Sequence, residues 1–429
     1  MSAEVAFVPG AATPRVQEAP RPVAVLLSRF PTVTETFILR EVIELERQGQ
    51  PVTLVPMLKD SPPVIHDAAK PWIDRAVYTW YLSPAITAAN LRALANQPLR
   101  YISLYARLFL GTILRPGTFA RTLAVFPKSV FLAEKLRADG VRHIHAHFAT
   151  HPTTMALIIS TLAPEITFSF TVHAHDIQLD RSLLRWKLRE ARFIRSISAF
   201  NKRFLEEKYP NETRGKISVI HVGIEPEIYE HQSRTIRPVT GGAPRILCVA
   251  AHRPYKGLPV LIEACRILRD QGVHARCDVV GTGPMTAELE QMIRDRNLSD
   301  TFRLLGARPQ EEVARLMAEA TLFALPSIIA ADGQMEGIPV ALMEAMASGK
   351  AVVSTTLSGI PELVESGTHG LLVAPGDAGG LAGALRTLLE DPARAKEMGA
   401  RGQEKVRAEF TLRGCVAELM ELLRAEARS

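Results

Sequence analysis

The sequence predicts an α/β protein of two doubly wound domains, whose parallel sheets face each other across a cleft. Three observations lead to this prediction. Short apolar runs alternate with amphipathic helical stretches along all 429 residues, the strand-like runs lack polar–apolar alternation, and a linker-like stretch divides the chain near its middle. Strands that are apolar on both faces are typical of parallel sheets covered by helices on each side.

Six strands are expected in each half of the chain. Those of the first half are Val23–Ser28, Val52–Met57, Arg142–His147, Thr167–Val172, Phe193–Ile197 and Ile217–His221. Those of the second half are Arg245–Ala250, Arg276–Val280, Arg303–Leu305, Leu322–Leu325, Ala351–Ser354 and Gly370–Val373. Helical periodicity lies between them, for example over Thr36–Arg47, Val130–Arg137, Ala199–Lys208 and Leu258–Asp270.

Residues 232–244 have the composition of a linker. We therefore predict a flexible tail over 1–20, a first domain over 21–236 and a second domain over 244–411. A last helix over 412–429 would pack back on the first domain. Ligands of doubly wound sheets bind at the carboxyl ends of the strands, so the cleft between the domains is the expected site.

Composition argues against several kinds of site. The four cysteines have no paired spacing, which disfavours a zinc site or a disulfide framework and favours a reducing compartment. Residues 1–20 do not resemble a signal peptide, and no run of about 18 uninterrupted apolar residues exists. The sequence has neither a P-loop motif nor an Asp-x-Asp pair. We expect a cytoplasmic protein without a metal or a cofactor.

Positive charge is concentrated in the first half. Residues 1–240 carry nine more basic than acidic residues, whereas residues 241–429 carry three more acidic than basic ones. Basic and aromatic residues interleave over 92–137, where Glu134 is the one acid. This pattern fits a helix on the inner face of an anionic membrane. A solvated basic face is the alternative, and nucleic acid is disfavoured because no recognised motif accompanies the patch.

The most informative motif runs from Glu336 through Gly337, Ile338, Pro339 and Val340 to Glu344. Pro339 fits the first position of a helix, so Glu336 would lie beside unpaired backbone N–H groups and Glu344 would lie inside the helix. Carboxylates suit the hydroxyls of a ligand and helix N–H groups suit its phosphate. A capped surface helix is the alternative.

Further motifs lie at or after the ends of predicted strands. Arg253 and Lys256 suit a diphosphate, although they could also be exposed loop residues. Gly281-Thr-Gly283-Pro is a weak nucleotide signal because the third glycine of a dinucleotide fingerprint is missing. His173-Ala-His175-Asp176 ends a strand at the expected site, as does the row His143, His145 and His147, for which strand-end packing is favoured over a metal. Gly359 and Glu362 repeat the loop-and-acid pattern.

In their order and spacing, the motifs of residues 245–375 resemble the retaining glycosyltransferases of family 4, which have the two-domain, Rossmann-like GT-B fold. Phe30-Pro-Thr-Val-Thr34-Glu-Thr-Phe37, His143–Phe148 and Phe170–Asp176 are similar to members that build exopolysaccharide, such as colanic-acid-type enzymes. The chain lacks the usual arginine five or six residues before Lys256. The usual glycine pair of the first strand's loop is also missing, and Ser28 to Pro31 stands there.

The resemblance implies a role for each candidate residue. Glu336 would contact the donor sugar, and His173 or His175 would line the donor–acceptor junction. Donor binding would involve Arg253, Lys256, Gly283, Gly337, Ile338, Pro339, Val340, Glu344, Gly359 and Glu362, with Glu344 on the ribose. Ser28, Thr34, His147 and Asp176 would line the acceptor side of the cleft.

The implied activity is sugar transfer from a nucleotide-diphosphate sugar to a lipid-linked or polysaccharide acceptor in cell-surface polysaccharide synthesis. Two alternatives remain open, namely a soluble transferase acting on a small acceptor and a nucleotide-sugar epimerase or binding protein.

Overall fold

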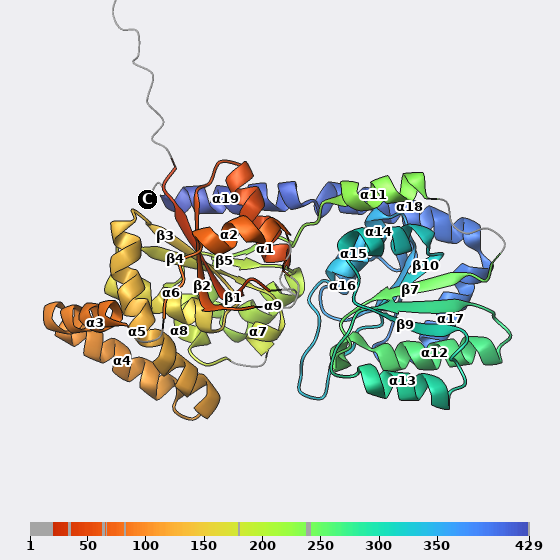
Figure 1. Cartoon of the computed structure of the whole chain (residues 1–429), viewed down its shortest axis with the longest axis horizontal. Coiled ribbons are helices and arrows are strands. Elements are labelled where there is room, and N and C mark those ends of the chain that lie inside the picture. The colour runs from red at the N-terminus through yellow and green to blue at the C-terminus, as the bar shows by residue number, and fades with distance from the viewer. Residues whose placement is uncertain are drawn as a thin grey trace, which may run out of the picture.

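The structure is a computed structural model that describes residues 20–32, 36–61, 65, 67–80, 83–178, 181–236 and 242–427. Its strands form two six-stranded sheets, in the orders β2-β1-β3-β4-β5-β6 and β12-β11-β10-β7-β8-β9. Every neighbouring pair is parallel. Figure 1 shows the two sheets side by side with helices around each. The predicted fold class is confirmed.

The first sheet and its helices span the first half of the chain. Its strands are β1 Val23–Phe30, β2 Val52–Lys59, β3 His143–His147, β4 Thr167–Val172, β5 Ile194–Ser196 and β6 Ile217–Val219. Its helices are α1 Thr36–Arg47, α2 Lys70–Arg75, α3 Pro84–Asn96, α4 Pro98–Thr112, α5 Pro116–Ala138, α6 His151–Leu162, α7 His175–Gln178, α8 Leu184–Glu190, α9 Ala199–Lys208 and α10 Pro210–Thr213.

The second sheet repeats the architecture. Its strands are β7 Arg245–Val249, β8 Arg276–Val280, β9 Phe302–Gly306, β10 Leu322–Ala324, β11 Val352–Thr355 and β12 Gly370–Val373. The remaining helices are α11 Pro226–Thr235, α12 Leu258–Asp270, α13 Thr286–Asp295, α14 Gln310–Glu319, α15 Val340–Ala347, α16 Ile360–Leu363, α17 Ala378–Glu390, α18 Pro392–Glu409 and α19 Leu412–Ala427.

All twelve predicted strands are present, with ends within two residues of those expected. The strand order reverses between β1 and β3 in the first sheet, and between β7 and β10 in the second. Such reversal points open a crevice at the carboxyl ends of the strands, because the flanking connections leave on opposite faces. The loops after β7 and β10 are therefore the expected walls of a ligand site.

The chain crosses between the sheets at two adjacent places. The Ile224 N–H donates to the Phe410 carbonyl (2.9 Å), and the Leu412 N–H donates to the Ile224 carbonyl (2.7 Å). After the first crossing, α11 packs on α14 and α15 of the second half. After the second, α19 returns across the top of Figure 1 to pack on α1, where Leu419 shares an apolar cluster with Ile38.

Candidate active site

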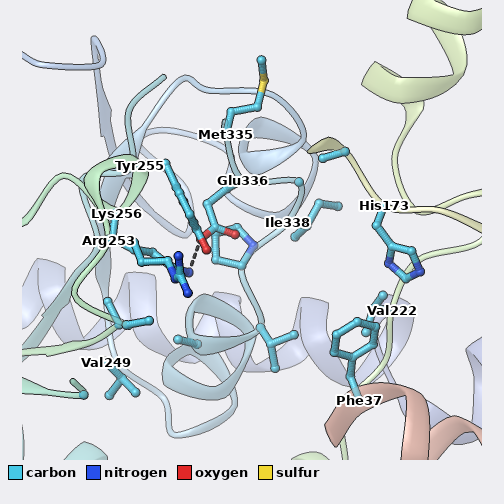
Figure 2. Close-up of a pocket in the computed structure, with 18 of the residues that line it drawn as sticks. Phe37, His173, Val222, Val249, Arg253, Tyr255, Lys256, Met335, Glu336 and Ile338 are labelled. Atoms are coloured by element: carbon cyan, nitrogen blue, oxygen red, sulfur yellow. Dashed lines mark ion pairs between the residues drawn. The ribbon is translucent and has the colours of Figure 1, made fainter. Parts of the chain in front are cut away.

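A cavity of about 800 Å³ lies where the loops at the carboxyl ends of the two sheets meet. From the first half, its lining includes Phe37, Phe148, His173, Ile197 and Val222. From the second half, the loops after β7, β8, β9 and β10 contribute most of the remainder, including Arg253, Tyr255, Lys256, Thr282, Arg308 and residues 334–341. Figure 2 shows Phe37 and His173 across the cavity from Arg253, Lys256 and Glu336.

Lys256 and Glu336 form an ion pair inside this cavity. The turn that carries Lys256 ends at Gly257, whose φ is 67°. A Cβ atom there would lie 1.9 Å from the Pro326 carbonyl oxygen, so only glycine lets this turn approach the loop after β10. Burial would lower the pKa of Lys256, but the Glu336 carboxylate outweighs it and raises the pKa overall. The ammonium therefore remains charged and available to an anion.

The amino end of α15 adds hydrogen-bond donors to the same wall. Val340 and Ala341, the first two helical residues, line the cavity. Pro339 is the residue before the helix rather than its first position, one residue from the prediction. Arg253 is exposed and lines the same cavity as these first residues of α15, whose backbone N–H groups lack intrahelical partners. Cations and oriented N–H groups together make a site for a phosphate-bearing ligand.

Glu344 lies one helical turn further on and does not line the cavity. Its carboxylate accepts a hydrogen bond from the buried Tyr229 hydroxyl of α11. Gln310 also donates to that hydroxyl (3.3 Å) and accepts from Arg40 of α1 (2.6 Å). Burial raises the pKa of Glu344, although the Tyr229 bond and the Arg40 charge oppose the rise.

Gly337 and Gly359 lie where the two halves touch. A Cβ atom on Gly337 would lie 2.7 Å from the His173 carbonyl oxygen, and one on Gly359 would lie 2.9 Å from Ser198 Cβ. Close packing between the domains is therefore part of the reason why glycine is needed at these two positions.

Two acids among the predicted site residues, Glu362 and Asp176, accept hydrogen bonds from backbone N–H groups of the first half. The Glu362 carboxylate accepts from the N–H groups of Ala199 and Phe200, which begin α9. The Asp176 carboxylate accepts from those of Ala149, His173 and Ala174 at 2.8, 3.0 and 2.9 Å. Asp176 thus fixes the backbone that presents His173 to the cavity.

A buried polar chain leads away from His173. His173 Nε2 lies 3.3 Å from His147 Nδ1, and His147 Nε2 lies 3.3 Å from the Glu41 carboxylate of α1. Glu41 is also paired with the buried Arg195. Burial would raise the pKa of Glu41, but Arg195 and His147 lower it well below the ordinary range. A negative charge therefore lies behind the histidine pair.

The ligand atoms of Glu41, His145 and His147 lie within 4.8 Å of one another, as in a metal site. These atoms already have protein partners. Both ring nitrogens of His145 contact hydroxyls of Ser169 and Thr171 at 2.8 Å, and Glu41 is paired with Arg195. The hydroxyls of β4 therefore explain His143 and His145 on the facing strand β3, whereas His147 contacts His173 and Glu41.

Several predicted site residues converge on the cavity and others do not. Those that line it are His173, Arg253, Lys256, Glu336, Gly337, Ile338, Pro339 and Val340. Those that lie outside its lining are Ser28, His147, Asp176, Gly283, Glu344, Gly359 and Glu362. Thr34 and the side chain of His175 fall outside the described part of the chain.

Some lining residues were not predicted. Arg308 follows β9 at the same sheet edge as Arg253, and that position was the available signal. Phe37 is the second residue of α1, and Met335 immediately precedes Glu336. Nothing in their own patterns separates these two from core residues, because only the meeting of the two halves makes them neighbours of the site.

Comparison with known proteins gives consistent results. Residues 231–405 match the family described as glycosyl transferases group 1. The chain is 33% identical over 412 residues to the amylovoran biosynthesis glycosyltransferase AmsK of Erwinia amylovora, covering 92% of this chain and 97% of that protein. It is also 33% identical over 416 residues to WcaL of Escherichia coli (strain K12), a relative named for colanic acid biosynthesis, covering 94% and 99%.

Solved structures share the fold. A glycosyltransferase from Rickettsia africae superposes with a TM-score of 0.69 at 16% identity, covering 95% of this chain and 98% of that one. Anabaena HepE in complex with UDP superposes with a TM-score of 0.66 at 18% identity, covering 94% and 100%. At this level of identity the likeness establishes the architecture alone.

Proposed function

The chain belongs to the glycosyl transferases group 1 family, and on this premise we propose that it moves a sugar from a nucleotide-diphosphate sugar to a lipid-linked or polysaccharide acceptor. The product would be part of a cell-surface polysaccharide, made at the cytoplasmic face of a membrane. The names of AmsK and WcaL, which refer to amylovoran and colanic acid biosynthesis, support a role in polysaccharide synthesis, and UDP in the HepE complex supports this donor class. The observation that carries the proposal is the Lys256–Glu336 pair in the cavity between the domains.

In this proposal the second half holds the donor. The diphosphate lies against Arg253, Lys256 and the amino end of α15, where positive charge and N–H groups neutralise its oxygens. Lys256 then exchanges part of its contact with Glu336 for a phosphate oxygen. The Glu336 carboxylate then faces the sugar and accepts hydrogen bonds from its hydroxyl groups.

In the proposed transfer step, the diphosphate is both the leaving group and the base. The bond from the sugar's anomeric carbon to the phosphate oxygen breaks, and a bond from that carbon to the acceptor oxygen forms on the same face. The acceptor proton passes to an oxygen of the departing phosphate. Configuration is retained because the new bond forms on the face that the phosphate leaves, as in family 4. Lys256 and Arg253 stabilise the charge that develops on the diphosphate, and Glu336 and His173 flank the oxocarbenium-like sugar.

The proposal is tested with a panel of nucleotide sugars and a membrane extract as the source of acceptor. The expected result is nucleotide release from one donor, together with transfer of its labelled sugar into the lipid or polysaccharide fraction. Transfer into neither fraction, with any donor, would contradict the proposed acceptor class. Epimerised donor without transfer would favour the alternative activity.

A further inference from the structure

Helix α4 is apolar on two opposite faces. Its inner face buries Leu104 and Leu108 in the core of the first half. Its outer face carries Leu99, Ile102 and Leu110, which are 85%, 57% and 72% exposed. These three, with residues 106 and 113, recur at intervals of three and four and therefore form one stripe along the helix. A second apolar stripe that contacts no core needs a partner outside the domain.

The stripe belongs to a wider concentration of exposed apolar residues. Among the described residues, eleven large hydrophobic side chains are exposed, and eight of them lie between Leu91 and Leu114. They are Leu91, Leu94, Leu99, Ile102, Tyr105, Leu110, Ile113 and Leu114. In Figure 1, α3 and α4 project from the outer end of the first half, on the side away from the second half. This surface, residues 91–114, is called the outer apolar surface below.

The charged residues within the outer apolar surface are all basic. No Asp or Glu occurs between Arg75 and Ala133. Arg100, Arg115 and Arg121 are exposed on or beside it. A second copy of this chain would bring the same arginines to the contact. Anionic lipid satisfies both parts of the surface, because acyl chains accept the apolar stripe and headgroup phosphates accept the arginines.

Not all basic residues of the segment predicted over residues 92–137 are available to a membrane. Lys128 is buried within α5 and donates to the Met57 carbonyl, and Arg92 is paired with Glu134. Arg107 lies over the Trp186 ring at 3.9 Å. Much of α5 lies in the core, so the segment as a whole is not one solvated basic helix. Among the described residues, no helix has the length and apolarity needed to cross a bilayer.

We propose that the outer apolar surface seats the protein on an anionic bilayer, with α4 lying in the interface. Leu99, Ile102, Leu110 and Leu114 would enter the boundary between headgroups and acyl chains, while Arg100 and Arg121 contact phosphates. The purpose of this seating, which is to meet a lipid-linked acceptor in the same membrane, rests on the proposed function. The surface itself rests on exposure, spacing and charge.

The test is flotation of the full chain with vesicles of phosphatidylcholine alone or mixed with phosphatidylglycerol, at low and high salt. Wild type should float with the mixed vesicles at low salt, weakly at high salt, and not with phosphatidylcholine alone. The combined Leu99→Ser, Leu110→Ser and Leu114→Ser variant should lose roughly 100-fold in partitioning. Arg100→Gln with Arg121→Gln should lose about tenfold or more.

Matched variants in the second half are the controls. Ile329→Ser removes an exposed aliphatic side chain, and Arg276→Gln with Arg394→Gln removes two exposed cations. These should float as wild type does. Wild-type failure to float, or undiminished floating of the leucine variant, would overturn the proposal. So would a wild-type dimer that the leucine variant converts to a monomer without any vesicle binding.

Nucleotide release from the donor, measured without vesicles, separates this proposal from the proposed function. The leucine variant should release nucleotide at the wild-type rate, because its changes are remote from the cavity. If wild type releases nucleotide but does not float with the vesicles, only the proposed membrane binding is overturned. Loss of nucleotide release from wild type with every donor would overturn the proposed function.

Discussion

The carboxylate of Glu362, in the second half, accepts hydrogen bonds from the backbone N–H groups of Ala199 (2.7 Å) and Phe200 (2.8 Å) in the first half. These groups begin α9, where N–H groups lack intrahelical partners and the helix dipole favours an anion. Glu362, an acid that the sequence predicts to contact the donor, is therefore hydrogen-bonded to the first domain. Beside it, Gly359 and Gly337 allow close contacts between the two halves.

Replacing Glu362 by Ala should weaken the contact between the domains. Two hydrogen bonds to a charged acceptor are lost, so we expect the free energy of unfolding to fall by about 1–3 kcal/mol. Small-angle scattering should also show a larger radius of gyration. Glu365→Ala, an exposed acid three residues away, is the control. Unchanged scattering together with weaker donor binding would instead indicate that Glu362 contacts the donor.

A side chain at Gly337 should damage activity more than stability. The added Cβ would meet the His173 carbonyl at 2.7 Å and Ile197 at 2.9 Å, which forces apart the loops that carry Glu336 and His173. For Gly337→Ala we expect kcat/KM to fall about 10- to 100-fold. Gly383→Ala, where a Cβ meets nothing within 4 Å, should leave kcat/KM unchanged. Equal kcat/KM values for Gly337→Ala and Gly383→Ala would show that activity does not depend on this close contact between the domains.

The half-buried Glu344 should cost stability at neutral pH. Burial raises its pKa, against the effects of Tyr229 and Arg40, so the folded state binds this proton more tightly than the unfolded state. The contribution to stability is therefore present at low pH and is lost as pH rises above the ordinary carboxyl value. Glu344→Gln, whose amide oxygen still accepts from Tyr229, should be at least as stable as wild type near pH 8.

Denaturant unfolding of wild type and Glu344→Gln at about pH 5 and about pH 8 checks the sign. The stability advantage of the variant should be larger at the higher pH. Donor affinity, measured on the same samples, should fall about tenfold if Glu344 binds the ribose. A variant that is less stable than wild type at both pH values would contradict the expected cost.

Glu41 should have the opposite pH dependence. Burial raises its pKa, but Arg195 and His147 outweigh burial and lower it, so the stability it contributes is present above the ordinary carboxyl value and lost as pH falls. Glu41→Gln leaves Arg195 buried without its anion, and we expect a loss of about 3–5 kcal/mol at neutral pH. Glu46→Gln, which breaks a more exposed pair with Arg75, should cost under about 1 kcal/mol. Equal losses in both variants would contradict this interpretation of the buried network.

Sequence patterns predicted the strands better than the helices. The strands are apolar and buried, so period and length identify them without knowledge of their neighbours. The stretch from 84 to 129 was harder, since α4 has exposed leucines on one face and buried leucines on the other. Pro127 lies inside α5, where a proline usually marks a helix end.

The site could be predicted in part because ligand-binding groups follow strands at a known sheet edge. This rule found Arg253, Lys256 and His173, and the helix start predicted at Pro339 found Glu336; all four residues line the cavity. It could not distinguish an acid facing a ligand from one facing the other domain, as with Glu362. That distinction depends on how the two halves approach each other, which no local pattern records.

The most direct test of the account is the turnover of Glu336→Gln with the donor that supports transfer. The variant keeps the size of the side chain but removes the charge that pairs with Lys256 and that we propose faces the sugar. We expect kcat to fall roughly 100- to 1,000-fold with intact folding, while Glu288→Gln, an exposed acid of α13, retains wild-type kcat. A Glu336→Gln kcat within about twofold of wild type would contradict the assignment of this cavity as the site of transfer.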